Sequence, residues 1–363
     1  MPRFNLLSTL LLLSLASLSP VSPLSLPARR AFVKAPIIAA ASFVAVGAGV
    51  IGKSSIDGPK PFTPGGGSME GKIVVITGAN TGLGLESTKR LVEAGARVVM
   101  CGRSVERLEK ASDSVKALYP KADLDVVELD LGDLSSIAAA SKTLNSLVPR
   151  IDTLILNAGI MALPKRVTTV DGFERQLGVN HLGHFAFVKG VVGLVGKAND
   201  GRVITVASSA QQFGTKASIL NLSDQPMYTP WGAYGQSKLA NVIFAEELQR
   251  RADKAEVKLT SVSLHPGVIA TDLGRYMMDT TKPATSLSTF AATAAQKLLR
   301  PIPNGANSHV YLASLSTSPE PGAYYTDMKL AKKNVRGGAG DEEVGRRLWE
   351  QSEEMTGLKF DFK

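Results

Sequence analysis

Short apolar runs alternate with helix-like patterns along the chain from Met69 onward. Most of the runs are continuously apolar, which is typical of strands that are covered on both faces. The pattern predicts strands at 72–77, 97–101, 124–129, 153–156, 202–207 and 259–264, and helices at 83–93, 104–118 and 133–147. Strand and helix in turn indicate a doubly wound parallel sheet with helices on both faces, so we expect one α/β domain over 69–363.

The first 68 residues do not follow this pattern. Arg3 precedes an apolar stretch, Leu6–Leu18, which has the features of a signal peptide. A second apolar run, Pro36–Gly52, has 17 residues, slightly fewer than the ~20 that span a bilayer. Pro and Gly in Asp57–Ser68 predict a flexible linker. We therefore interpret residues 1–68 as a targeting presequence and linker, and leave open whether Pro36–Gly52 anchors the protein to a membrane.

A basic, acid-free segment around Arg29 and Arg30 lies between the two apolar runs. Together with Phe32, this segment resembles the two-part presequences of algae whose plastids lie inside extra membranes, in which a phenylalanine marks the start of the transit portion. We favour a plastid location on that resemblance. The alternative is an endoplasmic-reticulum membrane anchor formed by Leu6–Leu18 or Pro36–Gly52.

Charge adds little to the picture. The chain has 41 Lys and Arg against 32 Asp and Glu, and residues 1–68 hold six of the bases and one of the acids. The presequence therefore carries +5 and the remaining residues only +4 of the net +9. No basic cluster interleaved with aromatic residues occurs in the domain, which argues against nucleic-acid binding. Cys101, the single cysteine, lies in an apolar run, and we expect a small buried hydrophobe there.

The segment Thr77–Gly84, TGANTGLG, lies between the first predicted strand and the first helix. Glycines in such a turn let the backbone approach a pyrophosphate, and the helix N-terminus offers free N–H groups and a positive dipole end. This context predicts a Rossmann-like dinucleotide site rather than an ordinary glycine turn. The binding residues expected in the loop are Gly78, Asn80, Thr81, Gly82, Leu83 and Gly84.

The end of the second strand bears on cofactor choice. An NAD-selective site places a carboxylate there for the ribose 2′-hydroxyl, whereas this chain has Arg103. Arg103 predicts a charge-assisted contact with the 2′-phosphate of NADP(H); the alternative is a solvated loop residue. Asp130 follows the third strand, where its carboxylate can accept from the adenine amino group.

Tyr234 and Lys238 stand four residues apart in a predicted helix and so share one face. A free tyrosine has a pKa near 10, and a nearby ammonium favours the phenolate. We therefore expect Lys238 to move the Tyr234 pKa toward neutrality. Ser208, at the end of a predicted strand, precedes Tyr234 by 26 residues.

Together these motifs resemble the short-chain dehydrogenase/reductase family over residues 70–330. The resemblance rests on the order and spacing of TGANTGLG, Asp130-Leu131, LNAG (156–159), NHLGHF (180–185), VASS (206–209), YGQSK (234–238) and HPG (265–267). Retinol-dehydrogenase-like members are the most similar. Several motifs also resemble the plastid short-chain dehydrogenase associated with the inner-envelope import machinery.

The resemblance implies roles for individual residues. Tyr234 would be the acid/base, Lys238 its partner and a ligand of the nicotinamide ribose, and Ser208 a hydrogen-bond donor to the substrate oxygen. Asn180 would hold a water that links Lys238 to solvent. Further cofactor contacts are implied for Leu131, Asn157, Ala158 and Gly159. Pro266 and Gly267 would border the nicotinamide, and Thr271 would reach its carboxamide or the phosphates.

The activity implied is NADP(H)-dependent interconversion of a lipophilic alcohol and its aldehyde or ketone. We expect the apolar segment from Thr271 to about Pro301 to cover that substrate. Two alternatives are a protochlorophyllide reductase, disfavoured because LNAG lacks a cysteine, and an NADP-sensing component of a plastid membrane complex. A homodimer is left open.

Other residues invite functional interpretations that we rank below packing. His181 and His184 lack an evident third metal ligand, so we predict packing or capping roles and no metal site. His265 precedes a Pro-Gly turn and is predicted to be structural. Tyr228 and Trp231 precede the Tyr234 helix, where lining the substrate mouth and ordinary packing are equally good interpretations.

Overall fold

The computed structural model describes residues 57–362, except 224–226, 270–298, 332–334 and 336. All described residues belong to one compact unit, Ser54–Lys363. Both apolar runs of the presequence lie outside the described residues, as does most of the predicted substrate-covering segment. Within the described ranges, no helix is long and apolar enough to cross a membrane.

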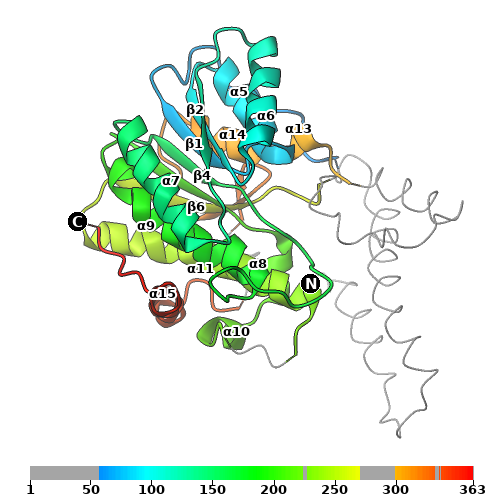
Figure 1. The fold of residues 1–363 in the computed structure, drawn as a ribbon, viewed down its shortest axis with the longest axis vertical. Coiled ribbons are helices and arrows are strands. Elements are labelled where there is room, and N and C mark those ends of the chain that lie inside the picture. The colour runs from blue at the N-terminus through cyan, green and yellow to red at the C-terminus, as the bar shows by residue number, and fades with distance from the viewer. Residues whose placement is uncertain (1–56, 224–226, 270–298, 332–334, 336, 363) are drawn as a thin grey trace, which may run out of the picture. The chain divides into compact units, whose positions relative to one another are not determined.

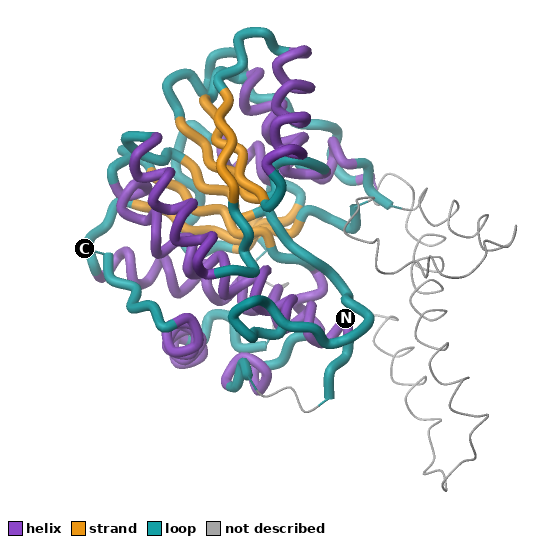
Figure 2. Tube along the Cα trace, in the orientation of Figure 1, coloured by secondary structure: helices purple, strands orange, loops and turns teal. Residues whose placement is uncertain are grey.

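An eight-stranded sheet forms the centre of the domain (Figures 1 and 2). Its strand order is β3-β2-β1-β4-β5-β6-β7-β8, and every pairing except the last, between β7 and β8, is parallel. The strands are β1 (Ile73–Thr77), β2 (Arg97–Gly102), β3 (Leu124–Glu128), β4 (Thr153–Leu156), β5 (Gly201–Val206), β6 (Leu259–His265), β7 (Tyr324–Thr326) and β8 (Lys329–Leu330). The order reverses between β1 and β4, which is where open parallel sheets bind nucleotides, beyond the carboxyl ends of the strands.

Helices cover both faces of the sheet (Figure 1). One face packs against α5 (Gly82–Glu93), α6 (Val105–Leu118) and α14 (Asn307–Ser314), and α13 (Ile302–Gly305) packs on α5 and α14. The other face packs against α7 (Leu134–Leu147), α9 (Gly183–Gly196) and α11 (Pro230–Lys254), and α15 (Glu342–Thr356) packs on the outside of α11. Shorter elements are α8 (Arg175–Leu177), a π-helical turn (Gly178–Leu182), a 3-10 turn (Ser209–Phe213) and α10 (Lys216–Leu220). Each face thus has its own hydrophobic core, which confirms the predicted fold class.

The predicted elements are present, with bounds that differ by no more than one residue. Ser104 and Asp133, predicted as first helical residues, are instead N-caps whose side chains accept from backbone N–H groups of α6 and α7. The apolar pattern did not reveal β7 and β8, which have three and two residues and are too short to show a period. It also did not reveal α15, whose Trp349 stacks on Phe244 of α11, with ring centroids 5.9 Å apart.

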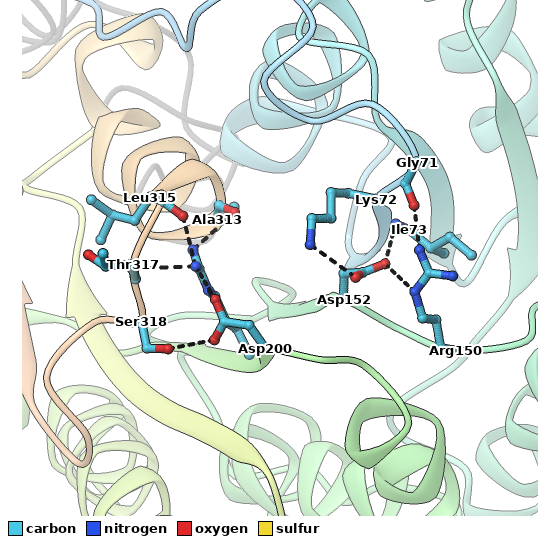
Figure 3. Close-up of polar contacts among 11 residues, drawn as sticks. Gly71, Lys72, Ile73, Arg150, Asp152, Asp200, Ala313, Leu315, Thr317 and Ser318 are labelled. Carbon is cyan, nitrogen blue, oxygen red and sulfur yellow. Dashed lines mark hydrogen bonds and ion pairs between the residues drawn. The ribbon is translucent and has the colours of Figure 1, made fainter.

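Buried charges at the amino edge of the sheet have structural partners (Figure 3). The Asp152 carboxylate, just before β4, accepts from the Ile73 N–H at 2.9 Å and pairs with Arg150 at 3.1 Å. Asp200, just before β5, pairs with Arg202, whose guanidinium also donates to carbonyls at the end of α14. These contacts join β1 to β4 and β5 to α14, so the charges at this edge belong to the scaffold.

The predicted linker is in part bound to the domain, which corrects the flexible-linker interpretation. The Asn307 side chain accepts from the Phe62 N–H at 2.8 Å and donates to the carbonyls of Pro59 and Lys60 at 3.1 and 2.8 Å. The Phe62 ring packs edge-on against Tyr311, with centroids 5.5 Å apart. Residues 57–62 therefore pack on α13 and α14, although their Pro and Gly content is that of a linker.

Candidate active site

The glycine-rich loop joins β1 to α5 at the carboxyl edge of the sheet. Gly78 and Gly82 have φ of +66° and +56°, a conformation that favours glycine. A Cβ at Gly84 would lie 2.3 Å from the Gly78 carbonyl oxygen, so only glycine lets α5 begin this close to the loop. Thr81 gives α5 no side-chain cap, unlike the caps of α6 and α7. The loop thus presents uncapped N–H groups at the positive end of a helix, which suits a pyrophosphate.

Asn157 joins the two halves of the sheet at the point where the strand order reverses. Its Nδ2 donates to the carbonyl oxygens of Thr77 and Gly78 at 2.8 and 3.3 Å. The next residue, Ala158, donates its N–H to the Thr77 hydroxyl at 2.9 Å. The LNAG segment therefore positions the glycine-rich loop through hydrogen bonds, in addition to lying beside it.

Residues predicted to contact the adenosine end follow β2 and β3. Arg103 is exposed immediately after β2 ends at Gly102. One Asp130 oxygen accepts from the Gly132 N–H at 2.9 Å, which holds its own turn. Leu131 is buried beneath that turn. The structure thus places all three at the carboxyl edge, on the β2–β3 side of the glycine-rich loop.

Tyr234 and Lys238 lie in the first part of α11, beside the end of β5. Lys238 Nζ donates to the Val206 carbonyl at 2.9 Å and lies 5.9 Å from the Tyr234 ring centroid. The side chain of Ser208, two residues beyond β5, is hydrogen-bonded to the Tyr234 hydroxyl. Both Tyr234 and Lys238 are 3% exposed, so this hydroxyl and ammonium are nearly shielded from water.

Burial dominates the electrostatics of this pair. It raises the pKa of Tyr234 to about 12, a shift that the hydrogen bond with Ser208 only partly opposes. It also lowers the pKa of Lys238 to about 8. The expectation that Lys238 would move the Tyr234 pKa toward neutrality is therefore wrong, because desolvation of the phenolate is the largest effect on that pKa. Tyr234 is held protonated at neutral pH.

Asn180 lies in the π-helical turn that precedes α9. Such turns are rare and often occur at functional sites. The Asn180 Oδ1 accepts from the Ile160 N–H at 2.8 Å, and its Nδ2 donates to the Ile160 carbonyl at 2.9 Å. A Cβ at Gly159 would lie 3.2 Å from Asn180 Oδ1 and 3.5 Å from Lys238 Nζ. Asn180, Gly159 and Lys238 are therefore brought together.

His184 is a structural partner whose exact contacts sequence reasoning missed. Its Nε2 is 3.0 Å from the Thr77 hydroxyl, and its Nδ1 is 3.0 Å from the Asn180 carbonyl oxygen. It thus links the glycine-rich loop to the turn that carries Asn180. The available signal was its position, four residues after Asn180 on the same helical face.

His181 and His265 also make hydrogen bonds that hold parts of the fold together. His181 Nε2 is 2.8 Å from the Ser352 hydroxyl, and His265 Nδ1 accepts from the Ser209 N–H at 3.1 Å. Within the ranges described, no group of three or more side chains is placed to hold a metal ion. These contacts agree with the packing roles predicted for the histidines.

The turn after β6 borders the same edge. Pro266 is buried, and Gly267 has φ of +98°. Thr271, predicted to reach the nicotinamide or the phosphates, lies outside the described residues. The His265–Ser209 contact holds this turn next to Ser208, so Pro266 and Gly267 lie on the side of the site opposite to Arg103.

Aromatic side chains lie beside the Tyr234 hydroxyl site. The ring of Trp231 contacts Tyr234 edge-on with centroids 6.1 Å apart, and Phe213 contacts Trp231 at 6.3 Å. Phe213 is 61% exposed and Trp231 is 36% exposed. Tyr228 instead donates its hydroxyl to the Leu163 carbonyl at 2.7 Å, which ties two loops together. The site therefore combines a buried tyrosine hydroxyl with an apolar aromatic rim.

Comparisons with known proteins agree with this geometry. The family model described as short chain dehydrogenase matches residues 72–282. Retinol dehydrogenase 14 from Homo sapiens is 37% identical over 311 residues, which cover 80% of this chain and 88% of that protein. Retinol dehydrogenase 12 from Homo sapiens is 35% identical over 295 residues, covering 81% and 89%.

Solved structures show the same fold. An uncharacterised protein from Mycobacterium paratuberculosis superposes with a TM-score of 0.62 at 33% identity, covering 82% of this chain and 100% of that one. A short chain dehydrogenase from Shigella flexneri, complexed with NADP, gives a TM-score of 0.55 at 19% identity over 72% and 98% of the two chains. At that identity the likeness concerns the fold alone.

Three fully buried histidines make stability sensitive to acid. Burial lowers the pKa of His181 to about 3, of His184 to about 4 and of His309 to about 3, from 6.5. Each of these histidines takes up a proton below pH ~6.5 in the unfolded chain, but only below pH ~4 in the folded protein. As the pH is lowered through that window, the free energy of unfolding therefore decreases by up to ~1.4 kcal/mol per pH unit for each histidine. Urea unfolding between these pH values measures this slope.

The variant His309→Leu serves as the control, because neither ring nitrogen of His309 has a hydrogen-bond partner among the described residues. Removing this group should reduce the slope by the share of one histidine. An identical slope in the variant and the wild type would contradict a neutral His309.

Proposed function

Because the chain belongs to the short-chain dehydrogenase family, we propose that it is an NADP(H)-dependent oxidoreductase that interconverts a lipophilic alcohol and its aldehyde or ketone. The observation that carries the proposal is the placement of Ser208, Tyr234 and Lys238 beside the glycine-rich loop, at one edge of the sheet. The intact site favours catalysis over a purely cofactor-sensing role.

Each side chain has a part in the proton transfer. When bound, the nicotinamide supplies the hydride for the substrate carbon. Tyr234, protonated at neutral pH, donates its proton to the substrate oxygen, and Ser208 donates a hydrogen bond to the same oxygen. The Lys238 ammonium stabilises the phenolate that remains and also binds the nicotinamide ribose.

The cofactor residues fit a dinucleotide. Glycines at 78 and 84 leave room where a Cβ would meet backbone, and the uncapped α5 N-terminus faces that loop. Arg103 is exposed at the end of β2, where its guanidinium would pair with a 2′-phosphate. One carboxylate oxygen of Asp130 accepts from the Gly132 N–H, and the other would accept from the adenine amino group.

The substrate class follows from the rim. Phe213 and Trp231 expose apolar ring surface beside the proton donor, which favours a lipophilic carbonyl compound over a charged one. The names of the curated relatives support the same class, with retinol as an example.

Replacement of Tyr234 by phenylalanine removes the proposed proton donor and keeps the ring. We expect turnover of aldehydes with NADPH to fall by roughly 10²–10⁴-fold, while NADPH binding, measured by fluorescence titration, persists. Tyr119→Phe, the same change at a partly exposed tyrosine after α6, should leave turnover unchanged. Near-normal turnover in Tyr234→Phe would show that another group donates the proton.

Removal of the Arg103 guanidinium tests the cofactor choice. NADPH should bind the wild type more tightly than NADH. Arg103→Ala should narrow that gap in binding free energy by roughly 1–3 kcal/mol, the range of a charge-assisted hydrogen bond. Lys116→Ala removes the same charge from the last turn of α6 and should leave the gap intact. Equal affinities of the wild type for the two cofactors would refute the NADP assignment.

We further propose a plastid location, supported by the two apolar runs and the basic segment between them. Residues 1–68 fused to a fluorescent protein should enter the plastid of an alga whose plastids lie inside extra membranes. The Phe32→Ala fusion should stop in an earlier compartment. Signal confined to the endoplasmic reticulum for both fusions would favour the membrane-anchor alternative.

A further inference from the structure

Arg300 lies between two segments that are distant in sequence. Its backbone N–H donates to the Val268 carbonyl at 2.8 Å, which places it beside the turn after β6. Its guanidinium donates to the Pro266 carbonyl at 3.0 Å and pairs with Asp327, next to β7, at 2.5 Å. The residue is 7% exposed, so these charge-assisted contacts are largely shielded from water.

Two glycines enclose this guanidinium from opposite chain segments. Gly58 and Gly267 have φ of +68° and +98°, so both positions favour glycine by conformation. A Cβ at Gly58 would lie 2.5 Å from the Arg300 Cζ, and a Cβ at Gly267 would lie 2.6 Å from it. Neither position has room for a side chain while the guanidinium stays in place.

The segment that carries Gly58 is itself held firmly. Asn304 donates to the Asp57 carbonyl at 3.0 Å, and Asn307 binds the backbone of residues 59–62. The Arg90 guanidinium, from α5, donates to Asn307 Oδ1 at 3.0 Å and to the Phe62 carbonyl at 3.2 Å. Gly58 is therefore fixed relative to both Arg300 and the helix that follows the glycine-rich loop.

We propose that Arg300, held against Gly58, is a positioning residue that sets the Pro266–Gly267 turn against the nicotinamide end of the cofactor. The inference rests on the proposed function, with the nicotinamide beside this turn as the family resemblance implies. Its consequence is that residues 57–62, upstream of the domain start predicted at Met69, belong to the machinery of the cofactor site.

The matched pair Gly58→Ala and Gly71→Ala, each in the full-length chain, isolates the contact with Arg300. Gly71 has φ of +71°, close to that of Gly58, but a Cβ there would meet nothing within 4 Å. Both substitutions therefore impose similar backbone strain, and only Gly58→Ala displaces the guanidinium from Pro266. Arg300→Lys is a second variant, since one ammonium keeps the charge but loses the planar fork of donors.

The measurements are the dissociation constants of NADPH and of adenosine 2′,5′-bisphosphate, which lacks the nicotinamide. Gly58→Ala should weaken NADPH binding by about tenfold, the effect of losing one hydrogen bond, and leave the bisphosphate unaffected. Arg300→Lys should act in the same direction, and Gly71→Ala should change neither constant.

Other outcomes overturn the inference. Equal effects of Gly58→Ala and Gly71→Ala, or equal weakening of both ligands, would reduce Arg300 to a general stabilising contact. If Gly58→Ala does not fold, unchanged NADPH affinity in Arg300→Lys would likewise overturn the positioning role. A wild-type protein that binds neither ligand would instead refute the proposed function.

Discussion

The hydrogen bonds of Asn157 hold together the place where the sheet reverses its strand order. Parallel strands on either side of that reversal leave a crevice at their carboxyl ends. The β1–β4 pairing ends at Ile76 and Ile155, so the chain beyond it has to be held by other contacts. Asn157 Nδ2 does this by binding the last carbonyl of β1 and the first of the glycine-rich loop. The phosphate loop lies on one side of this contact, and Gly159, Asn180 and Lys238 lie on the other.

Burial shapes the chemistry that this arrangement permits. Tyr234 and Lys238 are both shielded from water, and desolvation moves each toward its neutral form. A neutral phenol is ready to give a proton, and an ammonium with a pKa of about 8 is easily influenced by nearby charge. A bound dinucleotide brings negative phosphates to the same crevice, so its binding and the protonation of Lys238 should favour each other.

Local signals sufficed for most of the fold, and they singled out the residues that the structure brings together at the candidate site. The strands β1 to β6 could be predicted because most of them are short, continuously apolar runs, and the loop residues because glycines stand between a strand and a helix. Segments without such local signals were missed. The strands β7 and β8 are too short to show a period, and the π-helical turn around Asn180 depends on tertiary contacts with Ile160. The binding of residues 57–62 depends on Asn307, which is about 250 residues distant in sequence, and no composition rule reports such a partner.

The central claim is that the site transfers a hydride from NADPH to a lipophilic carbonyl compound. The most direct measurement uses NADPH that carries deuterium at the transferable position of the nicotinamide ring, with a panel of lipophilic aldehydes and the chain from residue 57 onward. Mass spectrometry of the product alcohol should find one deuterium on the former carbonyl carbon for each NADPH oxidised. Cofactor oxidation without deuterium in the alcohol, or tight NADPH binding with no alcohol from any aldehyde of the panel, would contradict the account.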